Sequence, residues 1–282
     1  MKLLVTGAGG LVGRALSRSL LDRHQVHGTF RHRPAPAGLV AHHVELAEPG
    51  AFQRVVDEIG PDLVVHTAYS MGDLERDVVA ATDAVASACR VAGVDLIHLS
   101  TDAVFDGEHA PYAEADLPRP VHPYGVAKRR AELAVLESVP GASVVRTALI
   151  AHLDRDEPDS GSRWLLEAQE RGEIVTMFTD EIRSVVRLVD LVAVISVLAE
   201  RDASERAGIW HVGGPDRLSR WDLGEIAVRR LGLDRSLIRA GSASAMGGPR
   251  PRDVSLSCER LAQLSVRPQP VDTVADHGQA NR

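Results

Sequence analysis

Short apolar runs alternate with amphipathic stretches through the first half of the chain. The runs predict strands at 2–5, 25–30, 40–44, 62–66, 95–99 and 143–146. Between them, residues 11–22 and 77–92 show the helical spacing of Leu, Val and Ala. Strands that alternate with helices are typical of βαβ units, so the pattern predicts an α/β fold with a doubly wound parallel sheet and helices on both faces.

A glycine-rich turn follows the first predicted strand directly. Gly7, Gly10 and Gly13, with Leu11 between them, open the first predicted helix. Such a turn brings backbone N–H groups and a helix amino end onto a pyrophosphate. Its position between a strand and an amphipathic helix predicts a dinucleotide site in a Rossmann-type sheet.

The pattern loosens after about residue 147, where polar segments rich in Gly and Pro appear, while 185–200 and 208–212 still resemble a helix and a strand of the main sheet. We therefore expect a smaller substrate-binding domain interleaved with the dinucleotide-binding domain. The predicted division is 1–147 plus about 176–212 for the dinucleotide and about 148–175 plus 213–265 for the substrate. Residues 266–282 have few apolar side chains, and we expect a mobile tail there.

The end of the second strand indicates which cofactor is used. An NAD site needs a carboxylate there for the ribose hydroxyls, whereas an NADP site needs positive charge for the 2′-phosphate. The strand ends in Arg31, His32 and Arg33, and no Asp or Glu occurs from 23 through 44. NADPH is therefore expected over NADH. The alternative is that both arginines are solvated loop charges.

Two further segments are assigned to the cofactor by position. Glu45 and Leu46 follow the third strand and are expected on the adenine side. Thr67 and Ala68 follow the fourth strand and are expected near the nicotinamide ribose.

The candidate chemistry lies at the end of the predicted fifth strand, where Thr101 stands, and in a later helix that carries Tyr124 and Lys128. Residues four apart share one helix face, so the Lys128 ammonium is expected to approach the Tyr124 phenol and lower its pKa toward neutrality. A phenol and a hydroxyl at the carboxyl edge of a parallel sheet suit carbonyl reduction. Taken alone, the Tyr/Lys spacing is equally that of a surface helix pair.

Composition narrows the functional classes. The net charge of -7 and the absence of long Lys/Arg runs argue against nucleic acid as a partner. No apolar stretch is long enough to span a membrane, and the amino terminus enters a strand directly, so we expect a cytoplasmic protein. The two cysteines and twelve histidines show no metal-ligand spacing, and no metal is expected.

The chain resembles the extended short-chain dehydrogenase/reductases, and most closely the dTDP-4-dehydrorhamnose reductase group. The likeness extends from residue 1 to about 264 and includes the glycine turn, Ser-Thr-Asp-Ala-Val-Phe-Asp-Gly at 100–107, Pro-Tyr-Ala-Glu-Ala-Asp at 111–116, Tyr-Gly-Val-Ala-Lys at 124–128 and Val-Arg-Thr at 145–147. The resemblance implies that Tyr124 donates a proton, Lys128 orients the nicotinamide ribose and Thr101 binds the carbonyl oxygen. Homodimers, some bridged by metal, occur among similar reductases, and a homodimer stays open here.

Three places depart from the group, one of them the segment 148–152, where relatives of known substrate often present an aromatic residue followed by a glycine. Ala103 replaces both the glutamate of the related dehydratases, which argues against dehydration, and the tyrosine usual in the reductases. Val78 stands about where many relatives have an asparagine that supports a helix bend and a proton-relay water.

The resemblance implies an NADPH-dependent reductase of a 4-keto sugar attached to a nucleoside diphosphate. The candidate substrate contacts are Val104, Phe105, His122, Arg183 and Arg250. Arg183 is equally readable as a helix-cap or salt-bridge residue. Two alternatives remain: an epimerase that retains NAD, and a non-catalytic subunit similar to the regulatory beta subunit of methionine adenosyltransferase.

Overall fold

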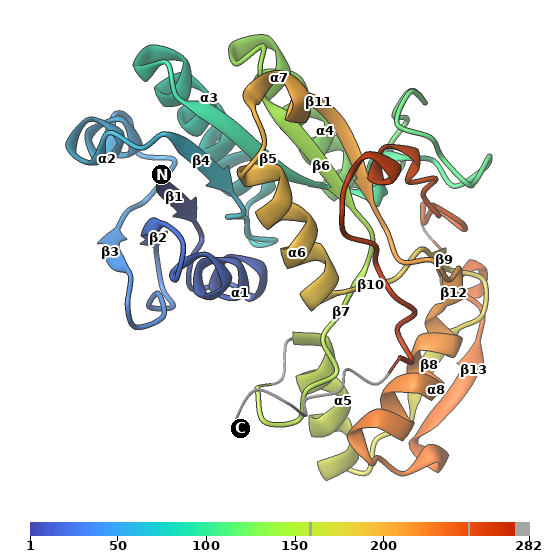
Figure 1. Ribbon diagram of the computed structural model, residues 1–282. Helices are drawn as coiled ribbons and strands as arrows, with labels where there is room; N and C mark the ends of the chain where they lie inside the picture. Colours follow the sequence, from blue (N-terminus) through green and yellow to red (C-terminus); the bar gives the residue numbers. More distant parts are fainter. Residues whose placement is uncertain (158–159, 248, 274–282) are drawn as a thin grey trace.

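The computed structural model describes residues 1–157, 160–247 and 249–273, and its centre is a parallel sheet (Figure 1). Seven strands pair in the order β11-β6-β5-β4-β1-β2-β3, and every pairing is parallel. They are β1 (Lys2–Thr6), β2 (Gln25–Phe30), β3 (Val40–His43), β4 (Leu63–His66), β5 (Asp95–Thr101), β6 (Ser143–Thr147) and β11 (Gly208–Val212). The chain reverses direction across the sheet between β1 and β4, so the predicted Rossmann-type fold is confirmed.

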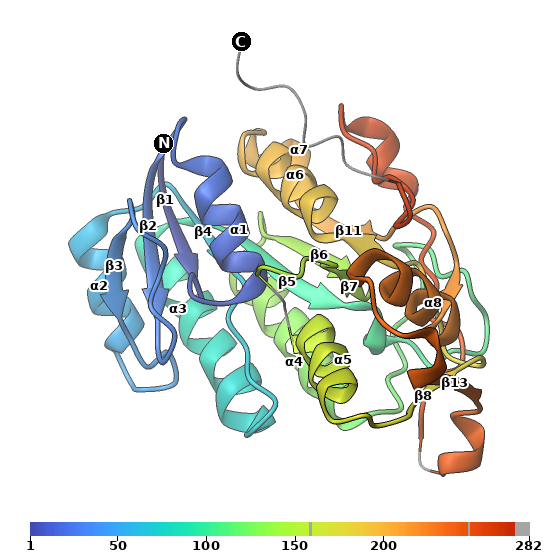
Figure 2. The same cartoon turned by 90° about the horizontal axis from the view of Figure 1, so that it is seen from below.

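Helices cover both faces of this sheet (Figure 2). On one face α1 (Leu11–Leu20) packs beside α6 (Leu188–Ala199), and both cover a core that includes Leu3 and Val5. The other face carries α2 (Ala51–Ile59), α3 (Ala81–Ala92) and α4 (Pro123–Ser138). Leu4 and Val64 point to this second core, because side chains alternate along a strand and the sheet is buried on both faces.

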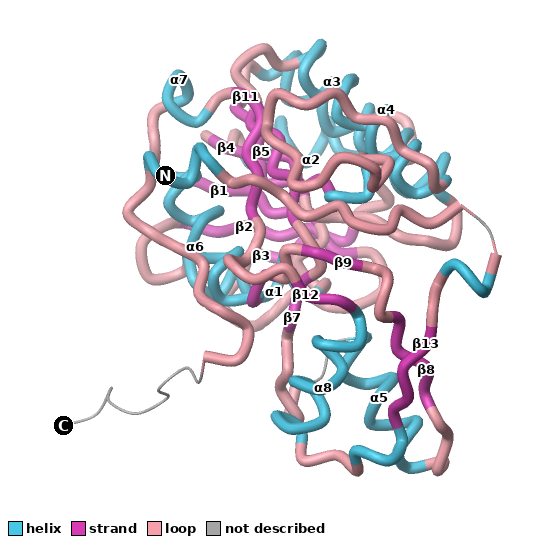
Figure 3. Tube along the Cα trace, turned by 90° about the vertical axis from the view of Figure 1, so that its right-hand side faces the viewer, coloured by secondary structure: helices cyan, strands magenta, loops and turns pink. Residues whose placement is uncertain are grey.

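A smaller part projects beyond the carboxyl edge of the sheet (Figure 3). Its apolar cluster joins two helices to a parallel pair of strands. These elements are α5 (Ser160–Glu170), β8 (Val175–Phe178), α8 (Arg220–Leu231) and β13 (Ile238–Gly241). Two-residue strands connect it to the main body: β7 (Ile150–Ala151) with β10 (Val186–Arg187), and β9 (Ile182–Arg183) with β12 (Leu218–Ser219). The segment 176–183, grouped above with the dinucleotide domain, therefore belongs to the smaller part, where 176–178 lie in β8 and 182–183 form β9.

Two local expectations need correction. The predicted helix 77–92 begins with a π-helical turn, Glu75–Ala80, before α3 continues it. Residues 266–273 do not form a loose tail, because Val271 is only 3% exposed and packs with Ala151 and Val185. The rest of that predicted tail, 274–282, lies outside the described residues. A short helix, α7 (Ala203–Arg206), precedes β11.

Candidate active site

The glycine turn after β1 is shaped by close backbone contacts. Gly7 has a φ of +68°, a conformation that favours glycine. A Cβ on Gly13 would lie 2.3 Å from the Gly7 carbonyl oxygen, and one on Gly9 would lie 2.0 Å from the Arg33 carbonyl oxygen. Gly10 begins α1 and offers no side-chain cap to its first N–H groups. The turn thus presents a helix amino end without a capping carboxylate or hydroxyl, which fits the pyrophosphate of a dinucleotide.

Thr6, the last residue of β1, links the carboxyl ends of β1 and β4. Its hydroxyl oxygen accepts hydrogen bonds from the backbone N–H groups of Thr67, at 3.2 Å, and Ala68, at 3.3 Å. The same hydroxyl contacts His66 Nδ1 at 2.7 Å. Thr67 and Ala68 are thereby held against the glycine turn, where a Cβ on Gly7 would meet Ala68 Cα at 2.8 Å. Sequence reasoning named the segment after β4 but not Thr6.

The positive charge of Arg31, just after β2, is neutralised by carboxylates from elsewhere in the chain. The Arg31 guanidinium donates to both carboxylate oxygens of Asp77, at 2.7 and 3.1 Å, and to Glu45 at 3.4 Å. Arg76 also pairs with Glu45, at 2.7 Å. The alternative of a solvated Arg31 is therefore wrong. An acidic residue therefore does lie at the end of β2. It is Asp77, which lies outside the stretch 23–44 where a carboxylate was expected.

The other residues predicted for the adenine end are divided between surface and core. His32 and Arg33 are exposed in the loop after β2. Glu45 is partly buried beside Arg31, whereas Leu46 is 8% exposed and packs in the core above α2. Leu11 is partly buried against the α1 core.

Thr101 and Tyr124 come together where β5 meets α4. Thr101 is the last residue of β5, and its hydroxyl accepts from Ala103 N at 3.2 Å and donates to Asp102 at 3.2 Å. Close packing sets the approach of α4, since a Cβ on Gly125 would lie 2.0 Å from the Ala103 carbonyl oxygen. His122, an expected substrate contact, is the exposed N-cap of α4 and accepts from Tyr124 N at 3.2 Å.

Lys128 does not point as expected. Its ammonium donates to the Leu99 carbonyl oxygen at 2.6 Å and contacts His98 Nε2 at 3.4 Å. The side chain is buried without a directly bonded carboxylate, and burial lowers its pKa to about 8, although Glu132 opposes this effect. His98 and the adjacent His66 are also buried, and burial together with Lys128 lowers the pKa of both imidazoles.

The Tyr124 phenol has a raised pKa. Burial is the main cause, Tyr69 and Asp102 add to it, and the hydrogen bond with Thr101 opposes it. The Tyr69 ring lies 5.9 Å from the Tyr124 ring, centroid to centroid. The expectation that Lys128 lowers the pKa of the phenol is thus wrong in this structure, because the ammonium faces Leu99. The phenol therefore stays protonated at neutral pH in this structure.

A group of arginines and carboxylates continues from Thr101 toward the smaller part. Arg183 lies 3.5 Å from the buried carboxylate of Asp102, so its salt-bridge interpretation is correct. Glu181 pairs with Arg220 at 3.3 Å and with Arg250 at 3.1 Å. Burial raises the pKa of Asp102, which Arg183 opposes, and burial together with Arg183 lowers the pKa of Arg220. Three guanidiniums against two carboxylates leave this group suited to an anion. Sequence reasoning missed Arg220, whose only signal is its place at the start of α8.

Two predicted substrate contacts belong to the core. Val104 and Phe105 are fully buried, and the Phe105 ring stacks on Tyr112 at 4.2 Å with the Arg146 guanidinium 5.2 Å from its centroid. Their side chains therefore support the loop after β5 from behind and do not face a substrate.

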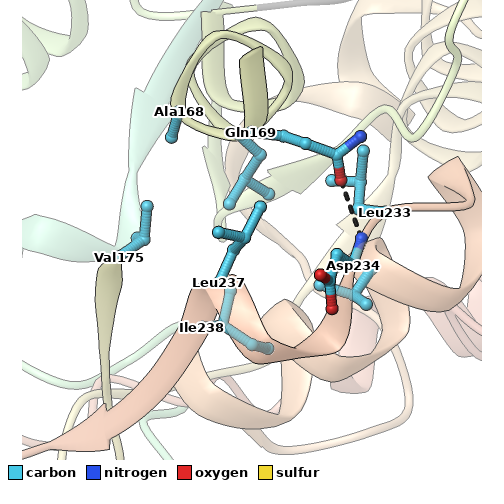
Figure 4. A pocket seen from close by; sticks show the side chains of 9 residues that line it. Ala168, Gln169, Val175, Leu233, Asp234, Leu237 and Ile238 are labelled. Atoms are coloured by element: carbon cyan, nitrogen blue, oxygen red, sulfur yellow. Dashed lines mark hydrogen bonds between the residues drawn. The ribbon is translucent and has the colours of Figure 1, made fainter. Parts of the chain in front are cut away.

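The cavities of the smaller part are separate from Tyr124. A cavity of about 10 Å³ lies between α5 and α8 and holds no more than a water molecule (Figure 4). Gln169 accepts from Asp234 N beside it, at 2.7 Å. A more open groove of about 400 Å³ lies beside the arginine group, lined by Gly107, Glu108, Thr179, Asp180, Ile182, Arg252 and Asp253.

Within the described residues, no group of three or more His, Cys, Asp or Glu could hold a metal ion. None of the helices that the structure describes is long and apolar enough to cross a membrane.

The sheet order, the glycine turn and the Thr101, Tyr124 and Lys128 set define an extended short-chain dehydrogenase/reductase. A family model, the RmlD substrate binding domain, matches residues 1–273, and the chain belongs to this family.

Three similar proteins illustrate its range. The probable dTDP-4,6-dihydroxy-2-methyloxan-3-one 4-ketoreductase of Streptomyces antibioticus is 30% identical, over 89% of this chain and 84% of that protein. Methionine adenosyltransferase 2 subunit beta of Bos taurus is 29% identical, over 94% of this chain and 83% of that protein. The structure of dTDP-4-dehydrorhamnose reductase from Bacillus anthracis in complex with NADP has a TM-score of 0.80 and 20% identity, and covers 94% of this chain and 93% of that one.

Proposed function

We propose that this protein is an NADPH-dependent reductase that converts the 4-keto group of a sugar carried on a nucleoside diphosphate to an alcohol. The observation that carries the proposal is the meeting of Thr101 and Tyr124 at the carboxyl edge of the sheet whose first strand leads into the glycine turn. Family membership and the ketoreductase from Streptomyces antibioticus support the substrate class. The NADP held by the Bacillus anthracis reductase supports the cofactor.

The chain's own groups divide the work. Gly7, Gly10 and Gly13 would hold the dinucleotide by its phosphates, and the reduced nicotinamide supplies a hydride when bound. The Tyr124 hydroxyl would give its proton to the carbonyl oxygen, because the raised pKa keeps the phenol protonated at neutral pH. The Thr101 hydroxyl would orient that oxygen. Lys128 keeps N–H capacity beyond its bonds to Leu99 and His98, and this capacity would serve the ribose.

The arginine group would take the substrate's charge. Arg183 and Arg220 lie near Asp102, and Glu181 joins Arg220 to Arg250. A diphosphate is recognised well by guanidinium groups, which pair with its oxygens in a forked geometry. The sugar would then extend from this group toward Tyr124. We further propose that the protein acts in the cytoplasm.

A second candidate function is a non-catalytic regulatory subunit. The likeness to methionine adenosyltransferase 2 subunit beta over 94% of this chain favours it. That function needs a binding surface but no proton donor, whereas this chain keeps Thr101, Tyr124 and Lys128 together.

The test is oxidation of NADPH and NADH by purified protein with dTDP-4-keto-6-deoxy sugars, with Tyr124→Phe alongside. The variant should bind NADPH as the wild type does and lose at least about 100-fold in turnover, because it lacks the proton donor. Unchanged turnover in Tyr124→Phe would rule the mechanism out. No turnover with any ketosugar, together with co-purification of a methionine adenosyltransferase, would support the regulatory subunit instead.

A further inference from the structure

Four charged groups near the end of β2 pair with one another, while Arg33 in the following loop is exposed. Arg31 pairs with Asp77, Glu45 pairs with Arg31 and Arg76, and the two arginines and two carboxylates sum to zero. A 2′-phosphate carries close to two negative charges and needs an uncompensated positive group. These four groups therefore present no excess positive charge to it.

The geometry makes Asp77 a direct competitor for such a phosphate. Both terminal nitrogens of Arg31 donate to the Asp77 carboxylate, at 2.7 and 3.1 Å. This is the two-point arrangement in which a guanidinium also binds a phosphate. The same pair of N–H donors cannot serve both partners at full strength.

The Arg31–Asp77 ion pair is buried enough to be strong, yet Arg31 is exposed enough to bind a phosphate instead. The Asp77 side chain is 8% exposed and Arg31 is 27% exposed. Asp77 lies in the π-helical turn before α3, from which its carboxylate reaches Arg31 after the end of β2. The hydrogen bond from Arg31 lowers the pKa of Asp77 and keeps the carboxylate charged at neutral pH.

We propose that Asp77 is a specificity-determining residue of the cofactor site, whose carboxylate competes with the 2′-phosphate of NADP(H) for Arg31 and so weakens the preference for the phosphorylated cofactor. This inference rests on the proposed cofactor site. It assigns to Asp77, distant in sequence, the acidic role that the segment after β2 lacks. Arg31 sets the attraction for the phosphate, and Asp77 sets how much of it is available.

The experiment measures equilibrium binding of 2′-phospho-ADP-ribose and ADP-ribose to the full chain by calorimetry, without turnover. Asp77→Asn keeps the shape of the side chain and removes its charge. We expect it to tighten 2′-phospho-ADP-ribose binding at least about fivefold and to change ADP-ribose binding less than about twofold. The gain should vanish in the Arg31→Ala background, since no guanidinium is left to release.

Glu75→Gln is the matched control. It removes one negative charge from the same π-helical turn, but Glu75 pairs with Arg130 and not with Arg31. An equal gain in Glu75→Gln, or no gain in a folded Asp77→Asn protein, would overturn the inference while leaving the dinucleotide site intact. Failure of the wild type to bind either probe would overturn the inference and the proposed reductase together.

Discussion

Two ion-paired networks lie at the two sides of the site, and they differ in what surrounds them. Glu132 on α4 and Arg146 on β6 are both 0% exposed, and their bonds are 2.9 and 3.0 Å long. Ser100 and Arg129 donate to the same carboxylate. Burial by itself raises the pKa of Glu132, but these donors outweigh it and hold the pKa below its usual range.

The network at Arg31 lies just after the end of β2 and is partly open to solvent. A closed network with every oxygen satisfied holds elements together, because a broken pair would leave a charge buried. A partly open one can exchange a partner for a ligand at low cost. We infer that the Glu132–Arg146 network fixes β5, α4 and β6 in place, and that the Arg31 network takes part in cofactor recognition.

The largest effect is expected from breaking the closed network. Glu132→Ala leaves Arg146 buried without a counter-charge, so the free energy of unfolding should fall by about 3 to 5 kcal/mol. Denaturant unfolding measures it, with Asp77→Ala as the comparison, where the loss should be smaller because Arg31 is 27% exposed and keeps Glu45 as a partner. Equal losses in the two variants would refute the contrast drawn above.

Lys128 sharpens the comparison, because it is a buried charge without a paired carboxylate. Its folded pKa of about 8 lies below the ordinary 10.5, so the ammonium destabilises the fold at pH 7 and the penalty fades as pH rises from about 8 to 10.5. Lys128→Met should be more stable than the wild type at pH 7, by about 2 kcal/mol, and should lose turnover. The stability gain should shrink at pH 10. A less stable variant at pH 7 would show that the ammonium is well paired.

The same pKa predicts a pH dependence of activity. If the ribose needs the Lys128 ammonium, kcat/KM should fall as pH rises through about 8, where the side chain loses its proton. A pH profile measured at saturating NADPH checks this. A profile flat to pH 9.5 would mean that cofactor binding restores the charge of Lys128.

The smallest effect is expected at a fully exposed pair. Arg130 and Glu75 have side chains that are 52% and 68% exposed, and water screens their attraction. Glu75→Gln should leave the midpoint of thermal unfolding unchanged within error. A clear fall would show that the exposed Arg130–Glu75 pair stabilises the fold, as the buried Glu132–Arg146 network does.

Much of the fold was predictable because its signals are local. Most strands of the main sheet are short apolar runs, and Gly7 and Gly13 follow β1 at the spacing of a phosphate turn. Thr101 and Tyr124 were found for the same reason, since both lie in short motifs. The smaller part was harder to predict because two-residue strands such as β9 and β12 have no periodicity to detect.

The sequence by itself determined the class of fold, the dinucleotide turn and the three residues proposed for chemistry, since each depends on neighbours within a few positions. Only the tertiary structure decided the charge environment of those residues. It brought Asp77 to Arg31, turned Lys128 toward Leu99 and His98, and buried Phe105 behind the site. The physical reason is that pKa, ion pairing and burial depend on distances in space, which side chains far apart in the chain set for one another.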